Sequence, residues 1–276
     1  MERAVDIDTI RTMARHMRLD IVDMISKAGS GHPGGSLSSA DIVAALYFGV
    51  MNHDPQRPQW PERDRFVLSK GHAAPLLYSA LANAGYFDRD HLNTLRQLGS
   101  ILQGHPDSKK VPGVEVSTGS LGQGLSIANG IALGLRAAGS ASTVYCLMGD
   151  GELQEGQVWE AAMSAAHYKI DNLVAIVDHN GLQIDGACAD VMDVGDIEAK
   201  FEAFGWVVTG VDGHDIPALV DALARAKSVR SAPAIVVCRT VKGKGVSFME
   251  NDADWHGKAP DEEQTACAVT ELSCEL

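Results

Sequence analysis

The order of apolar runs in the second half of this chain restricts it to a narrow class of folds. Residues 143–180 have the pattern strand, helix, strand, and residues 206–241 repeat it. Strands that alternate with helices form parallel sheets, because each crossover helix returns the chain to the same edge. The sequence therefore predicts an α/β fold, a mostly parallel sheet with helices on both faces. The predicted strands here are 143–148, 173–180, 206–211 and 234–241.

The first half adds helices, one further strand and glycine-rich loops. Apolar residues within 10–25 recur at helical spacing, and Gly29 is placed to end that helix. A Gly/Pro loop precedes a second predicted helix, where Ser38 and Asp41 have the spacing of a capping box. Residues 64–68 predict a strand that leads through a glycine turn into another helix.

The length of the chain limits the number of domains, and its net charge limits the kinds of partner it can bind. The 276 residues are 45% hydrophobic, which is enough for a sizeable core, and neither a repeat nor a break in composition divides them. We therefore predict a single domain over 1–276, with a C-terminal tail from about 263. The formal net charge of −13 excludes a typical nucleic-acid binder, because affinity for the phosphate backbone depends on clustered Lys and Arg.

Cysteine usage and hydropathy predict the compartment. The chain has an odd number of cysteines, five, and no CxxC pair, which argues against a disulfide framework. This usage favours a reducing compartment such as the cytoplasm. The N-terminus has no apolar segment typical of a signal peptide. Residues 116–135 carry no charge but contain five glycines, so they predict a glycine turn and a buried helix rather than a membrane span.

The stretch "GDGELQEGQ" places Asp150 at the end of one predicted strand, and Asn180 ends the next strand of the same βαβ unit. Ligands bind beyond the carboxyl ends of parallel strands, so both side chains are expected in one crevice. A carboxylate, an amide oxygen and one backbone carbonyl are hard ligands that suit Mg²⁺ or Ca²⁺. The alternative is an ordinary Gly-Asp-Gly turn, in which Asp bonds its own backbone.

Several motifs together carry a family resemblance. GDG followed by Asn180 resembles a thiamine-diphosphate motif. "SGHPGGSLSSADIVAALYF", "DRFVLSKGHAAPLLYSAL", "GSLGQGLSIANGIALG" and "KGKGVSFMENDADWHGKAP" lie around it in the order typical of transketolases. Over roughly residues 8–262 the chain resembles the diphosphate-binding domain of the transketolase family.

The resemblance implies a cofactor site built on thiamine diphosphate and Mg²⁺ (or Ca²⁺). Asp150, Asn180 and the carbonyl of Leu182 would hold the metal, and Asp150 and Asn180 would hold the cofactor through it. His179 stands where many relatives have a first Asn, a position that does not bind the metal. Further cofactor-binding positions implied by the family are Gly119, Leu121 and Gly151.

Four histidines in glycine-flanked loops match family positions that line a substrate channel, and imidazole can donate or accept a proton near neutral pH. A zinc site made by three of them is the competing interpretation, although none shows the spacing of H-E-x-x-H.

Glu155 resembles a family residue at a dimer interface around the active sites. Lys242 and Lys244 either meet a phosphate or lie in a solvated loop. The catalytic residues implied by the resemblance are His32, His72, His105, His256 and Glu155.

The resemblance also implies a partner. In the transketolase family the glutamate that activates the cofactor's aminopyrimidine lies in a pyrimidine-binding domain, and no segment here resembles that domain. We therefore expect the diphosphate-binding subunit of a split transketolase, which transfers a two-carbon ketol unit between sugar phosphates in an α₂β₂ assembly with a C-terminal subunit. The alternatives are an E1α-like subunit of a 2-oxo-acid dehydrogenase, a deoxyxylulose-phosphate-synthase-like chain, or a non-catalytic cofactor-binding subunit.

Overall fold

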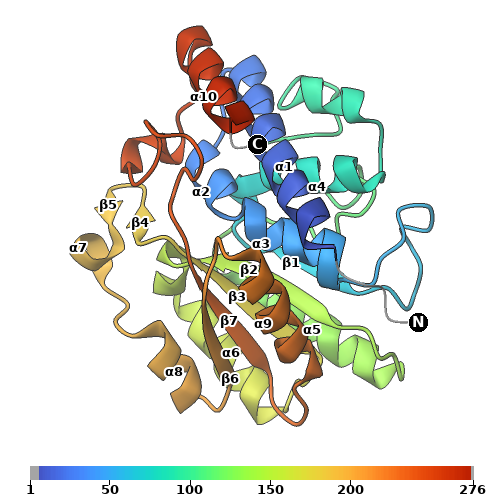
Figure 1. Ribbon diagram of the computed structural model, residues 1–276. Coiled ribbons are helices and arrows are strands. Elements are labelled where there is room, and N and C mark those ends of the chain that lie inside the picture. The colour runs from blue at the N-terminus through green and yellow to red at the C-terminus, as the bar shows by residue number, and fades with distance from the viewer. Residues whose placement is uncertain (1–5, 275–276) are drawn as a thin grey trace.

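The centre of the computed structural model, which describes residues 6–274, is a five-stranded sheet in the order β1-β2-β3-β7-β6 (Figure 1). Every neighbouring pair in this sheet is parallel. The predicted α/β fold is confirmed, and each predicted strand is present. The strands are β1 (Arg65–Leu68), β2 (Val144–Gly149), β3 (Leu173–His179), β6 (Val207–Asp212) and β7 (Ala234–Arg239); a small antiparallel hairpin is formed by β4 (Leu182–Gln183) and β5 (Gly186–Ala187).

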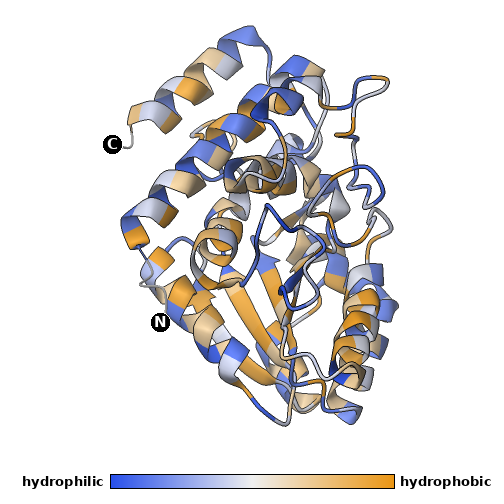
Figure 2. Cartoon of the chain, turned by 90° about the vertical axis from the view of Figure 1, so that its right-hand side faces the viewer, coloured by the Kyte–Doolittle hydropathy of each residue, from blue (hydrophilic) through white to orange (hydrophobic). Residues whose placement is uncertain are grey.

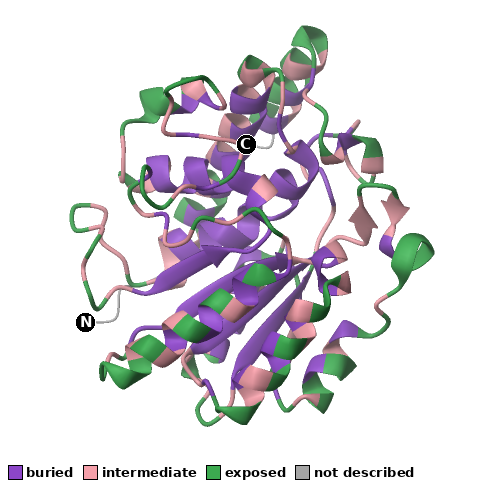
Figure 3. Ribbon diagram, turned by 180° about the vertical axis from the view of Figure 1, so that it is seen from behind, coloured by how far each residue is buried: buried purple, intermediate pink, exposed green. Residues whose placement is uncertain are grey.

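Helices cover both faces of this sheet because its strands are apolar on both sides (Figure 2). Along β2, Tyr145 and Leu147 join one core while Cys146 and Met148 join the other, as alternation along a strand requires. Strands β1, β2, β3 and β7 are buried over nearly their whole length (Figure 3). The first core contains α1 (Ile7–Ala28), α2 (Pro33–Ser38), α3 (Ala40–Ala45), α4 (Ala74–Ala84) and α9 (Ile216–Ser228), and the second contains α5 (Gln123–Ala137), α6 (Gly156–His167) and α8 (Ile197–Ala203).

One of the two local signals near the N-terminus is confirmed and the other is wrong. Gly29 ends α1 in the left-handed conformation, with φ of 61°. The capping-box interpretation of Ser38 and Asp41 fails, because α2 already begins at Pro33 and no side chain caps α3. Both residues instead satisfy buried groups far away in sequence: Ser38 donates to Asp178 (2.6 Å), and Asp41 pairs with Arg18.

The remaining helices lie at the surface and at the end of the chain. The expected tail helix is α10 (Glu262–Cys274), which contacts α1 and buries Ala268 and Leu272 completely. Within residues 6–274, no helix is both long and apolar enough to cross a membrane. The other short helical segments are α7 (Cys188–Met192), a π-turn (Leu46–Val50) and 3-10 turns at Gly71–Ala73, Arg89–Thr94, Gly151–Gln154 and Ala253–His256.

Candidate active site

A cavity of about 460 Å³ opens at the carboxyl ends of β2 and β3, where ligands of parallel sheets bind. It brings together residues from seven separate segments of the sequence: 32–35, 70–72, 119–121, 149–155, 178–184, 242 and 256. Every residue proposed from the sequence as catalytic, cofactor-binding or metal-binding lines it, except His105. Those lining residues are His32, His72, Gly119, Leu121, Asp150, Gly151, Glu155, Asn180, Leu182 and His256.

Asp150 is a buried carboxylate without a cationic partner. It is 2% exposed and accepts hydrogen bonds from the backbone N–H groups of Gly151 (2.8 Å) and Gly181 (2.5 Å). Burial, followed by the nearby charge of Asp178, raises its pKa above the ordinary range. No Lys, Arg or His within residues 6–274 forms an ion pair with it. A buried negative charge left uncompensated in this way fits a bound cation.

The second carboxylate of the cavity is already neutralised. Asp178, at the end of β3, is fully buried and accepts from Lys70 Nζ at 2.6 Å, from Asn180 Nδ2 at 2.9 Å, and from the hydroxyls of Ser38 and Thr240. These donors hold the pKa of Asp178 low against the effect of burial. Sequence reasoning missed Lys70 and Asp178 as site residues, although Lys70 lies inside the motif "DRFVLSKGHAAPLLYSAL" and Asp178 lies two residues before Asn180.

Glu152, the second acidic residue of the GDG segment, is structural. Its carboxylate is 3% exposed and accepts from the backbone N–H groups of Gly122 (2.9 Å) and Gly149 (3.1 Å) and from the Ser69 hydroxyl. Gly122 has φ of +81°, and a Cβ there would lie 2.6 Å from Glu155 Cβ, so only glycine fits. Glu152 therefore ties the "LGQG" turn to the GDG turn.

Asn180 and Leu182 both line the cavity, and each has an oxygen atom with a hydrogen bond to a neighbouring group. Asn180 Oδ1 accepts from the Leu182 N–H (3.1 Å), and the Leu182 carbonyl accepts from Lys242 Nζ (3.2 Å). Each of these oxygens has a second lone pair for another partner.

Of the two lysines in "VKGKG", only Lys242 lines this cavity. Lys244 pairs with Glu250 (3.2 Å) and lines a different cavity.

Three of the four histidines form one cluster. The rings of His32, His72 and His256 have centroid separations of 5.1, 5.5 and 5.2 Å. The fourth, His105, lies beside Gly119, where a Cβ would come within 3.2 Å of its ring. Within the described part of the chain, no group of three His, Cys, Asp or Glu side chains is arranged to hold a metal, so the zinc interpretation finds no support.

Burial keeps the clustered imidazoles neutral. It lowers the pKa of His32 to about 4, of His72 to about 2 and of His256 to about 3, and neighbouring cations such as Arg96, Lys70 and Lys242 lower them further. The pKa of His105 is lowered in the same direction, again by burial and then by Arg96. Each ring can therefore serve as donor or acceptor at neutral pH.

We expect His32, His72 and His256 to remain neutral at pH 5.5 in the isolated chain. Their lowered pKa values mean that protonation begins only well below the value of about 6.5 typical of an unperturbed histidine. ¹H–¹³C NMR of histidine-labelled protein, assigned with single His→Gln variants, measures this directly. A cluster ring that titrates near 6.5 would contradict the buried environment described above.

Comparison with known proteins identifies the family. The family model described as "transketolase, thiamine diphosphate binding domain" matches residues 9–275. The chain belongs to the transketolase family. It is 43% identical to the 6-deoxy-6-sulfo-D-fructose transketolase subunit SqwG of Clostridium sp. (strain MSTE9), over 99% of this chain and 98% of that protein. It is 42% identical to an apulose-4-phosphate transketolase subunit of Actinobacillus succinogenes, over 97% of each.

Longer transketolases match the same part of the fold. Human transketolase is 44% identical over 91% of this chain, which corresponds to 40% of the human protein. The crystal structure of the Campylobacter jejuni transketolase superposes with a TM-score of 0.91 at 36% identity, covering 97% of this chain and 43% of that one. This transketolase chain is thus a thiamine-diphosphate-binding domain, and its open cavity with the uncompensated Asp150 fits a diphosphate–metal group.

Proposed function

We propose that this chain, as one diphosphate-binding domain, is a subunit of a two-component transketolase that moves a two-carbon ketol unit from a ketose phosphate to an aldose acceptor. The observation that carries the proposal is its 42–43% identity, over nearly their whole lengths, to two proteins named as transketolase subunits. Their names concern a sulfonated ketose and a phosphorylated ketose, so the donor here is expected to be a ketose with an anionic end.

The cofactor role follows from the uncompensated charge at the strand ends. Asp150, Asn180 Oδ1 and the Leu182 carbonyl would hold Mg²⁺, which in turn would bind the diphosphate of thiamine diphosphate. Gly119, Leu121 and Gly151 line the cavity and let the backbone come close to the cofactor. The bound cofactor supplies the carbon nucleophile that attacks the ketose carbonyl.

The histidines would donate protons to the sugar and accept protons from it during the reaction. Neutral His32, His72 and His256 lie within one cluster and can donate to a developing alkoxide or accept from a hydroxyl. Lys242 donates to His256 Nδ1 (2.9 Å), which leaves the Nε2–H of that ring as its donor. His105, beside Gly119, would contact substrate farther from the diphosphate.

The partner is proposed to cover the open side of the cavity. Ile184 lines the cavity yet is 66% exposed. Apolar residues exposed beside a functional cavity are typical of surfaces that a second chain covers. A C-terminal subunit with a pyrimidine-binding domain would fill this role, and two copies of each chain would form an α₂β₂ assembly with Glu155 near its centre.

The test is an assay of the co-purified pair against a panel of ketose phosphates and sulfonated ketoses. We expect ketol transfer with at least one donor, and His256→Ala should lower kcat by about 10²–10⁴-fold while cofactor affinity persists. His91→Ala, an exposed histidine far along the sequence, is the matched control. Absence of transfer with every donor would refute the function, and an unchanged kcat in His256→Ala would refute the role of that ring.

A further inference from the structure

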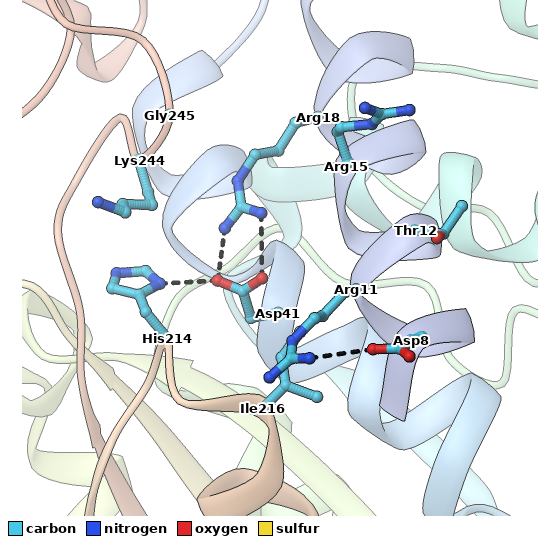
Figure 4. Close-up of a pocket in the computed structure, with 10 residues that line it drawn as sticks. All are labelled: Asp8, Arg11, Thr12, Arg15, Arg18, Asp41, His214, Ile216, Lys244 and Gly245. Atoms are coloured by element: carbon cyan, nitrogen blue, oxygen red, sulfur yellow. Dashed lines mark hydrogen bonds and ion pairs between the residues drawn. The ribbon is translucent and has the colours of Figure 1, made fainter. Parts of the chain in front are cut away.

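A buried ion pair lines a second cavity, separate from the candidate active site, between α1, α3 and the segment that precedes α9. Arg18 donates two hydrogen bonds to Asp41, at 3.0 and 2.5 Å, and both side chains are only 8% exposed. His214 donates from Nδ1 to the same carboxylate at 2.7 Å (Figure 4). The carboxylate is therefore clamped from two sides, and this geometry fixes the plane of the imidazole.

The other nitrogen of His214 holds the backbone beyond β7. Its Nε2 accepts from the N–H of Val241 at 2.9 Å. A ring that accepts at Nε2 and donates at Nδ1 is a single neutral tautomer. Strand β7 ends at Arg239, so the N–H of the half-buried Val241 lies beyond the strand ladder, and His214 supplies its acceptor.

The residues on either side of Val241 bond to residues that line the cavity, and Lys242 itself lines it. Thr240 donates its hydroxyl to Asp178. Lys242, which is 2% exposed, donates to the Leu182 carbonyl at 3.2 Å and contacts His256 Nδ1 at 2.9 Å. Anchoring of the backbone at Val241 thus sets where two site side chains can point.

We propose that His214 is a positioning residue: it fixes the backbone at Val241 so that Lys242 holds His256 with its Nε2–H directed to substrate. The catalytic importance of His256 rests on the proposed function. The hydrogen-bonded chain from Arg18 through Asp41 and His214 to Val241 is independent of that function. The rigid ring spans the distance between a clamped carboxylate and a backbone N–H. A flexible side chain would have to lose more conformational entropy to do the same.

The first arm of the test measures the tautomers in the isolated chain without substitutions. ¹⁵N NMR of histidine-labelled protein distinguishes protonated from unprotonated ring nitrogens, and His→Gln variants assign the signals. We expect His214 as the Nδ1–H tautomer and His256 as the Nε2–H tautomer. The opposite tautomer at either ring overturns the proposal, whatever the enzyme turns out to catalyse.

The second arm separates the two bonds of His214. His214→Asn can still donate to Asp41 from near the Nδ1 position but is too short to reach Val241, whereas the longer amide of His214→Gln offers both a donor and an acceptor. We expect the Asn variant to lose the uniform tautomer of His256, and the Gln variant to keep it. In the co-purified complex, kcat of the Asn variant should fall about 10–100-fold with KM little changed, as for residues that orient a functional group.

The possible outcomes discriminate between the claims. A normal His256 signal or a normal kcat in His214→Asn overturns the positioning role, as does a failure of His214→Gln to restore both. His91→Gln controls for the loss of any imidazole. If the unsubstituted complex transfers no ketol unit while both tautomers are as expected, the proposed function is wrong. The hydrogen-bonded chain through His214 is then still supported.

Discussion

Purified alone and supplied with thiamine diphosphate and Mg²⁺, the 276-residue chain is expected to show no ketol transfer. Asp150, Asn180 and the Leu182 carbonyl, which line the cavity, are the groups proposed to hold the diphosphate end of the cofactor. The family resemblance places the carboxylate that activates the aminopyrimidine on the partner, across the interface between the two chains. Without that carboxylate the nucleophilic carbon is not generated, so the loss is expected to be complete.

A coupled spectrophotometric assay with and without the partner subunit measures this effect. Addition of the partner should restore turnover to the range normal for enzymes, roughly 1 s⁻¹ or more. Turnover in that range by the isolated chain would contradict the two-component proposal. Size-exclusion chromatography at the assay concentrations would show whether the pair forms the proposed α₂β₂ assembly.

The second large effect concerns Asp150. Asp150→Ala should abolish metal-dependent binding of thiamine diphosphate, because it removes a buried carboxylate that lines the cavity at the end of β2 and has no cationic partner within residues 6–274. Loss of a direct ligand is expected to exceed the roughly 10–100-fold typical of groups that only support a ligand. Isothermal titration calorimetry of the co-purified complex, with Mg²⁺ or with a chelator, gives the measurement.

Folding of this variant is controlled separately. Removal of Asp150 leaves the N–H groups of Gly151 and Gly181 without their acceptor, which costs stability. The pKa of the Asp150 carboxyl is raised in the folded state, so its charged form destabilises the fold without ligands at neutral pH. Removal of that charge offsets part of the cost of the lost hydrogen bonds. The melting temperature without ligands should therefore change little. Unchanged metal-dependent affinity in a folded Asp150→Ala would remove Asp150 from the metal site.

The sequence alone predicted the parallel α/β sheet and the meeting of Asp150 and Asn180 at one of its edges. Alternating strand and helix patterns specify a parallel sheet because the period of hydrophobicity and the crossover length are local properties. Once the sheet is parallel, Asp150 and Asn180 must lie at one edge, 30 positions apart in sequence but on adjacent strands. The histidines came from the family resemblance rather than from any local physical signal.

Only the tertiary structure decided which charges neutralise each other. Three acidic residues crowd the GDG segment, yet Asp150 has no cationic partner within residues 6–274, Glu152 binds backbone N–H groups, and Glu155 lines the cavity. Lys70 pairs with Asp178 across 108 positions, and Asp41, which sequence spacing suggested as part of a cap, pairs with Arg18 and His214 instead. Local spacing cannot predict such partners, because a buried charge is satisfied by whichever donor the packed elements bring within about 3 Å.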